Sequence, residues 1–112
     1  MTAAAMGKDV IVVLLFWTIK KLAERRIDED FPPEYASAAG DVARLLKGKR
    51  VPKISEMFEE AKLVGQFRLI ACSAGLEYMG VEEQAVTTRV DAVMGLPAIL
   101  TLTAGAETTL FI

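Results

Sequence analysis

Two continuous apolar runs in the chain predict buried β-strands. Residues Val10–Phe16 and Phe67–Ala71 consist of β-branched, aliphatic and aromatic side chains, with Arg68 as the only polar interruption. Such runs are typical of strands in a parallel sheet, because helices then cover both faces of the sheet. Apolar and polar residues alternate over Arg89–Met94, which predicts a shorter strand, and Thr108–Ile112 predicts a strand that closes the chain.

Helices are predicted between these strands. The longest amphipathic pattern opens at Pro32-Pro33 and ends at Gly48, and its apolar residues recur every three or four positions. They are Tyr35, Ala38, Ala39, Val42, Leu45 and Leu46. We expect this stripe to face the core. The other predicted helices are the end of one at Met1–Met6 before Gly7, Thr18–Ile27, one from an N-cap at Ser55 to Gly65, one from Cys72 to Gly80, a turn at Glu82–Ala85, and a last helix with Pro97 in its first turn.

Strands that alternate with helices predict an α/β fold, in which helices cover both faces of a parallel sheet. The chain has 112 residues, the size of one domain, so we expect a single domain over 1–112. Its apolar content is 53% before the eight glycines are counted, whereas typical globular chains reach about 45–50% with glycine included. This excess favours a sheet covered on both sides or an interface between subunits.

The net charge argues against nucleic-acid binding, and the length of the apolar runs argues against a membrane-spanning segment. A net charge of −2 argues against general nucleic-acid binding, which needs a basic surface. One short basic cluster, Lys47, Lys49, Arg50 and Lys53, is either a solvated loop, which we favour, or a docking patch for an acidic partner or a small anion. The run Val10–Trp17 is much shorter than the roughly 20 residues of a membrane-spanning helix. No small-residue cleavage site of a signal peptide follows this run. We therefore expect a cytoplasmic protein without a transmembrane segment.

The side chains available for chemistry are few. There is no histidine, so neither a Ser-His nor a Cys-His pair can form within the subunit. The single cysteine excludes an intrachain disulfide. One thiol without any histidine also provides too few of the usual nitrogen and sulfur ligands for a metal site. We therefore expect no metal and no bound cofactor.

That cysteine, Cys72, lies where a predicted strand meets a predicted helix. Chemistry in open α/β sheets collects beyond the carboxyl ends of the strands. A thiol at a helix N-terminus also meets unpaired N–H groups, which stabilise the thiolate. The alternative is a buried structural thiol, since cysteine is among the most buried residue types. Gly75 would allow a ligand or a second chain to approach, and Trp17 is either a core residue or a wall of the pocket over Cys72.

Three segments resemble the DsrE/DsrF-like sulfur-relay family. Cys72–Val81 resembles its cysteine segment, Ala5–Val10 leading to Phe16-Trp17 resembles its first helix and second strand, and Thr109–Ile112 resembles its last strand. The resemblance implies a flavodoxin-like or Rossmann-like fold, a trimer or hexamer, and a persulfide carried on Cys72. Its partners would be sulfur donor and acceptor proteins, or small molecules that contain sulfane sulfur. The substrate pocket would be lined by Phe16, Trp17, Ser73 and Gly75.

The chain departs from this family in two places. The family begins with a strand and a glycine-bearing loop, whereas this chain starts inside the following helix. Either the start is placed too late, or the first strand is absent and the sheet is completed otherwise. Leu15 and Thr18 stand where the family has a small polar residue and a glycine, which predicts a less polar pocket.

Two other functions are compatible with the same segments. One is a non-catalytic subunit that binds other subunits or a small molecule and in which Cys72 only packs. The other is a peroxide-reducing thiol protein, which is disfavoured because no second cysteine can resolve a sulfenic acid within the subunit.

Overall fold

A parallel sheet forms the centre of the computed structural model, which describes residues 1–28 and 31–110. Within these residues the sheet has three strands in the order β1 (Val10–Leu14), β2 (Phe67–Cys72) and β3 (Ala92–Met94). Val10 pairs with Phe67 at one end of the β1–β2 ladder, and β3 pairs with the second half of β2. The sheet confirms the predicted α/β class and is consistent with a flavodoxin-like or Rossmann-like fold, whose usual first strand has no counterpart within the described residues.

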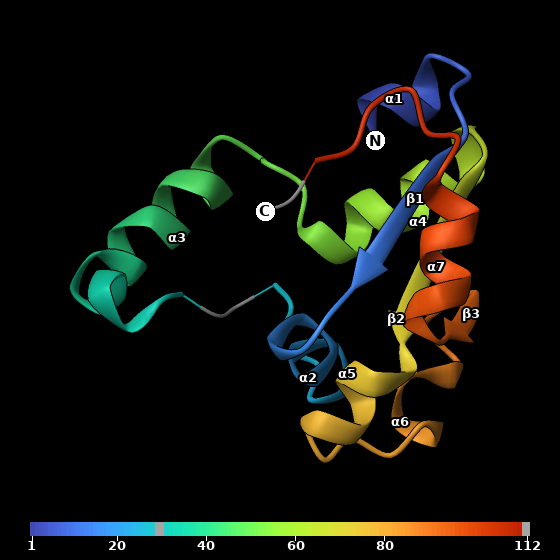
Figure 1. Cartoon of the computed structure of the whole chain (residues 1–112). Helices are drawn as coiled ribbons and strands as arrows, with labels where there is room; N and C mark the ends of the chain where they lie inside the picture. Colours follow the sequence, from blue (N-terminus) through green and yellow to red (C-terminus); the bar gives the residue numbers. More distant parts are fainter. Residues whose placement is uncertain (29–30, 111–112) are drawn as a thin grey trace.

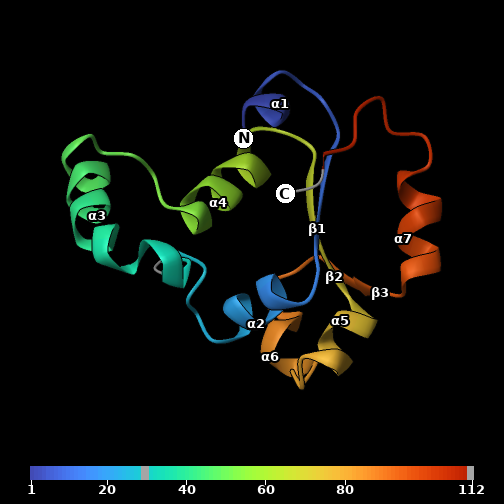
Figure 2. The same ribbon diagram turned by 60° about the vertical axis from the view of Figure 1, so that its left-hand side comes forward.

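Helices cover both faces of the sheet (Figures 1 and 2). Helix α7 lies on one face, and α2, α4 and α6 lie on the other. Helix α5 follows β2 at the carboxyl end of the sheet, and α3 stands away from the sheet. The helical elements are α1 (Thr2–Ala5), α2 (Trp17–Ala23), the 3₁₀ helix η1 (Pro33–Ala38), α3 (Ala39–Gly48), α4 (Ile54–Val64), α5 (Ser73–Tyr78), α6 (Gln84–Thr87) and α7 (Leu96–Thr103).

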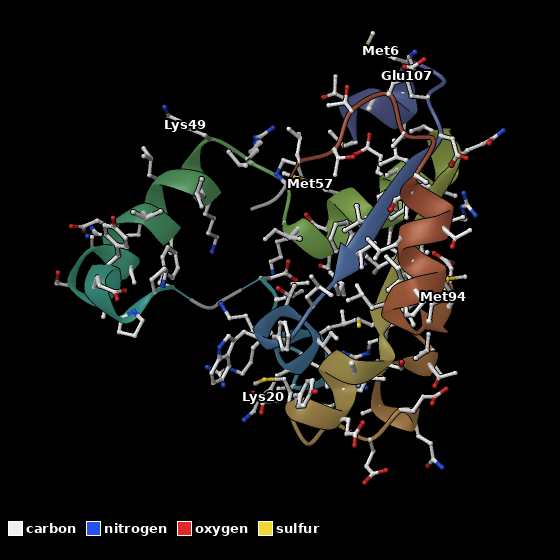
Figure 3. The ribbon with its side chains drawn as sticks, viewed as in Figure 1. Met6, Lys20, Lys49, Met57, Met94 and Glu107 are labelled. Carbon is white, nitrogen blue, oxygen red and sulfur yellow. The ribbon has the colours of Figure 1, made fainter. Side chains whose placement is uncertain are left out.

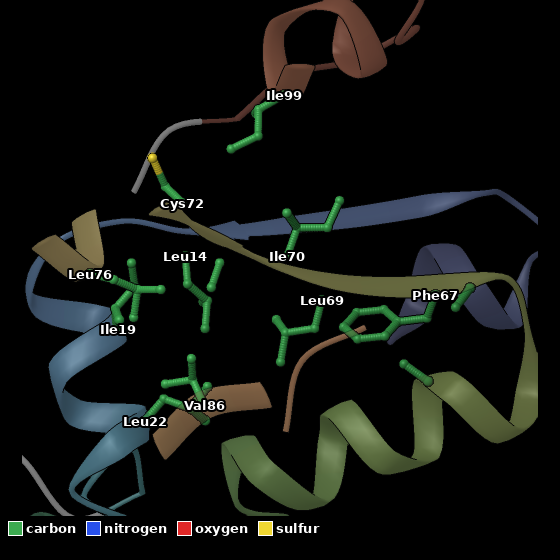
Figure 4. Packing of buried hydrophobic residues seen from close by; sticks show 13 residues of the cluster. Leu14, Ile19, Leu22, Phe67, Leu69, Ile70, Cys72, Leu76, Val86 and Ile99 are labelled. Carbon is green, nitrogen blue, oxygen red and sulfur yellow. The ribbon is translucent and has the colours of Figure 1, made fainter. Parts of the chain in front are cut away.

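The central strand β2 supplies much of the core (Figure 4). Successive residues of a strand point to opposite faces of the sheet. Phe67 and Leu69 therefore point toward α4, whereas Ile70 and Cys72 point toward α7 (Figure 4). The largest fully buried side chains are Ile19, Leu69, Ile70 and Val86. A strand buried on both faces explains why the run Phe67–Ala71 is almost entirely apolar.

Several predicted elements are shorter in the structure because the backbone leaves the regular conformation early. Strand β1 ends at Leu14 instead of Phe16, since Phe16 has a φ of 44° and turns the chain into α2. Helix α2 ends at Ala23 instead of Ile27, and Arg25 has a φ of 60° just after it. Only Ala92–Met94 of the predicted strand Arg89–Met94 is a strand.

The stripe predicted to face the core over residues 32–48 does not do so. This segment forms η1 and then α3, and none of the residues of these two elements, all of which are described, is buried. Tyr35, Leu45 and Leu46 are exposed. The periodicity predicted an apolar face correctly, but α3 stands apart from the sheet (Figure 1), so the prediction that this face packs on the core is wrong.

The predicted closing strand, Thr108–Ile112, is not seen over 108–110, and residues 111–112 lie outside the described residues. No helix within 1–28 and 31–110 is both long enough and apolar enough to cross a membrane.

The start of α4 is stabilised by Asp28, from a distant part of the chain. Helix α4 begins at Ile54, so Ser55 is not its N-cap as predicted but lies in its first turn. The Asp28 carboxylate accepts hydrogen bonds from the Ser55 backbone N–H at 2.9 Å and from its Oγ at 2.6 Å. Burial raises the pKa of this carboxyl group, but the Ser55 hydrogen bonds and the charge of Lys53 outweigh burial and lower the pKa below its usual value.

Replacing Ser55 with alanine is expected to raise the pKa of Asp28 and to destabilise the protein by about 1.5 kcal/mol at neutral pH, because a bond to a charged group is lost. A group with a lowered folded-state pKa stabilises the fold above its unfolded pKa, about 3.9 for aspartate. The difference between wild type and Ser55→Ala should therefore shrink as the pH falls below about 4. Urea unfolding at several pH values and an NMR titration of Asp28 measure both effects. Ser37→Ala, at an exposed serine, is the control; an unchanged Asp28 pKa in Ser55→Ala would contradict the assignment.

Candidate functional site

Cys72 is the last residue of the central strand and the N-cap of α5, as the sequence predicted. Its backbone is extended, with φ −78° and ψ 123°, and the helix begins at Ser73. The carboxyl ends of β1 and β3 lie at the same edge of the sheet, where the chain continues into α2 and α7. The thiol is therefore at the edge where open α/β sheets usually bind their ligands.

The thiol is covered in this structure. Only 4% of Cys72 is exposed, and it belongs to the apolar core cluster. Its side chain points to the face covered by α7, and the side chain of Ile99 extends toward it (Figure 4). Ile99 is itself 4% exposed and is the one buried residue of α7, a helix that is wholly described. A reactant that comes from the α7 face must displace this helix or its side chains before it reaches the sulfur.

The aromatic residues predicted for the pocket lie on the outside of the same edge. Phe16 and Trp17 are both exposed. Phe16 stacks with Tyr78 of α5, with ring centroids 6.2 Å apart, and Lys20 Nζ is 5.8 Å from the centre of the Trp17 ring. Sequence reasoning missed Tyr78, whose position at the end of a short helix gave no sign of a partner across the turn.

Two hollows lie near these elements, and Trp17 and Cys72 do not both border either of them. Trp17 borders one of about 590 Å³ together with Lys20, Lys21 and Pro32 (Figure 3 labels Lys20, which belongs to α2). A second hollow, of about 350 Å³, lies between α2 and α4 and has Arg25, Asp28 and Arg89 in its wall. Cys72 lines neither.

Ser73 and Gly75 have different surroundings, although both are in α5. Ser73 is exposed at the first position of the helix, while Gly75 is buried. A Cβ atom on Gly75 would lie 2.7 Å from Ile19 Cδ1 and 3.1 Å from the Phe16 backbone nitrogen. Gly75 therefore allows α5 to pack closely on the start of α2, and the segment that approaches it belongs to the same chain.

Two polar residues near the sheet, Asp91 and Arg89, have structural contacts. Asp91 accepts a hydrogen bond from the Leu69 N–H at 2.7 Å and donates its own N–H to the Leu69 carbonyl at 2.8 Å, which extends the β2–β3 pairing. Arg89 Nη1 donates to the Leu22 carbonyl at 2.6 Å. Within the described ranges, no three His, Cys, Asp or Glu side chains are grouped as a metal site would need.

The basic cluster is exposed: Lys47 lies in the last turn of α3, and Lys49, Arg50 and Lys53 lie between α3 and α4. This location is compatible with the solvated loop that we favoured and equally with a docking patch.

Neither the protein-family models nor the curated proteins compared with this sequence gave a match. The resemblance to the sulfur-relay family thus rests on the motifs in the sequence and on the agreement in fold class.

Proposed function

We propose that this protein carries sulfane sulfur as a persulfide on Cys72 and passes it to an acceptor thiol. The observation that carries the proposal is the position of Cys72, at the end of the central parallel strand and immediately before α5. The likeness of the segment Cys72–Val81 to the cysteine segment of sulfur-relay proteins supports it further. Exposed aromatic residues at the same edge, Phe16 and Trp17, offer a surface on which a donor or acceptor protein can dock.

The chemistry needs no histidine, metal or cofactor. The Cys72 thiolate attacks the outer sulfur of a donor persulfide, R–S–SH, and a new S–S bond forms while the donor S–S bond breaks. The donor leaves as a thiolate, and Cys72 becomes Cys72–S–SH. An acceptor thiolate then attacks the same outer sulfur, takes it as its own persulfide and releases the Cys72 thiolate. Each displacement moves one sulfur atom, and there is no net oxidation.

The Cys72 sulfur becomes accessible when α7 moves away from the sheet. Helix α7 packs on the core through one buried side chain, Ile99, and one half-buried side chain, Leu102, while Leu96 and Leu100 are exposed. An element with few buried apolar contacts opens at a small cost in free energy. Displacement of α7 would uncover the face of the sheet to which Cys72 points.

We further propose that the protein works as a homo-oligomer, a trimer or hexamer as the resemblance implies, in the cytoplasm. Large apolar side chains on the outside of the subunit support self-association. Among them are Trp17, Tyr35, Leu45 and Leu46.

A second candidate is a non-catalytic interaction subunit of the same fold. The observation that favours it is the 4% exposure of Cys72 among apolar neighbours, which is the usual environment of a structural cysteine. The two candidates differ in one property, the reactivity of Cys72 in the folded protein.

The experiment exposes native protein to an inorganic polysulfide and measures its intact mass. Since Cys72 is the only cysteine, wild type is expected to gain sulfur that an excess of thiol removes, and Cys72→Ser is expected to gain none. Ser73→Ala, which changes the exposed neighbour, should still load. Equal gain by wild type and Cys72→Ser, or no gain by wild type, would contradict the proposal.

A further inference from the structure

The hollow of about 350 Å³ lies on the face of the sheet opposite the Cys72 side chain. Its apolar lining includes Leu22 of α2 and Leu69 of β2, which lie on the same face (Figure 4). Phe58 of α4 and Ile27, both half-buried, add to this apolar surface. The volume is at the lower end of the range for small-molecule sites, which typically combine an apolar lining with a few polar groups.

The polar groups of the hollow come from separate parts of the chain. Helix α4 turns one face toward it, since the residues of this helix that line the hollow are spaced by three, four and seven positions from the first. They are Ser55, Phe58, Glu59 and Lys62. Arg25 follows α2, and Arg89 lies between α6 and β3. The fold thus brings cationic side chains from three segments to one hollow.

Two of the charged groups at the hollow already have an opposite charge nearby. Lys62 Nζ lies 3.5 Å from Asp91 Oδ1. The Asp28 carboxylate accepts both hydrogen bonds of Ser55, and the charge of Lys53 stabilises it further. These pairs therefore contribute little net charge to the hollow.

The two arginines have N–H groups to offer to a ligand. Among the residues that the structure describes, the Arg25 guanidinium has no hydrogen-bond or ion-pair partner. Arg89 Nη1 donates to the Leu22 carbonyl at 2.6 Å, and the Arg25 backbone N–H donates to the same carbonyl at 3.2 Å. This shared acceptor fixes the Arg89 guanidinium beside the Arg25 backbone. Against these two cations the lining has the carboxylate of Glu59, so one positive charge is in excess.

We propose that this hollow binds a small organic monocarboxylate, with its carboxylate on Arg25 and Arg89 and its apolar part on Phe58 and Leu69. A guanidinium matches a carboxylate through two parallel N–H···O bonds. One positive charge in excess favours a ligand with one negative charge, and the apolar lining favours an organic ligand over an inorganic anion. Since the Cys72 side chain points to the other face (Figure 4), binding here does not depend on sulfur chemistry.

Benzoate is the probe for this site, because it joins a small apolar ring to one carboxylate. An NMR titration of the wild type is expected to show saturable shifts of the Ile27, Leu69 and Arg89 amides. Benzamide, which has the same shape without the charge, should bind at least about tenfold more weakly, because bonds to a charged group are the stronger ones. No saturable shift with benzoate, or equal affinity for benzamide or inorganic phosphate, would overturn the inference. Cys72→Ser should bind benzoate as wild type does, so this test is separate from that of sulfur transfer.

Arg25→Gln removes one charge of the site without removing a side-chain contact of the fold. It is expected to weaken benzoate binding about tenfold. Arg26→Gln, the same change at the next residue, whose side chain borders the other hollow, should leave the affinity within about twofold. Glu59→Gln should strengthen binding, because it removes a like charge from the lining. Circular dichroism checks that the variants fold. Unchanged affinity in Arg25→Gln, or an equal loss in both arginine variants, would show that the carboxylate does not bind here.

Discussion

Replacing Ile99 with alanine is expected to accelerate alkylation of Cys72 by iodoacetamide in the folded protein by about 5–30-fold, the factor that corresponds to 1–2 kcal/mol. Ile99 is the buried residue of α7, and its side chain extends toward the thiol (Figure 4). Truncation of a buried isoleucine to alanine costs about 2–5 kcal/mol. If alkylation requires α7 to open, the lost packing lowers the free energy that local opening of α7 requires. The alkylation rate then rises by the corresponding factor.

Leu100→Ala is the matched control, because Leu100 is in the same helix and is 61% exposed. This variant should leave the alkylation rate within about twofold of wild type, as surface substitutions change stability by less than about 0.5 kcal/mol. Equal rates in wild type and Ile99→Ala would mean that α7 does not control access to Cys72.

Replacing Leu69 with alanine is expected to destabilise the fold by about 3 kcal/mol, within the usual range for buried leucines. Leu69 is 2% exposed near the middle of β2 and points to the α4 face, on which Leu22 and Val86 also lie (Figure 4). The substitution leaves the backbone bonds to Asp91 in place, so the loss reports side-chain packing. Since a domain has only about 5–15 kcal/mol of stability, the shift in the urea midpoint should be large.

Leu63→Ala is the control for this prediction, with the same change of side chain on the exposed side of α4. Its unfolding free energy should stay within about 0.5 kcal/mol of wild type. If both variants lose similar stability, Leu63 is buried by another subunit. If neither does, β2 is not the centre of the core.

The apolar runs of the sequence predicted the sheet because a parallel strand is buried on both faces. Both long runs became strands, and Cys72 lies at the predicted junction of β2 and α5. The ends of the elements were less predictable. Phe16 and Arg25 adopt positive φ angles, which are expected mainly at glycine. Because neither residue is glycine, nothing in the sequence indicated that β1 and α2 end early.

The surroundings of the site could not be predicted from spacing. The sequence places Cys72 at the end of a strand, but which face its side chain takes depends on the register with β1 and β3. In the structure the thiol points toward α7 (Figure 4). In the same way, periodicity shows that α3 has an apolar face but not which surface covers it.

The most direct test of sulfur transfer compares the uptake of polysulfide sulfur by wild type in native buffer and in urea, followed by intact mass. We expect the folded protein to take up sulfur on Cys72 to the same extent as the unfolded protein. Uptake in urea together with none in native buffer would contradict it, and would identify Cys72 as a packing residue of an interaction subunit.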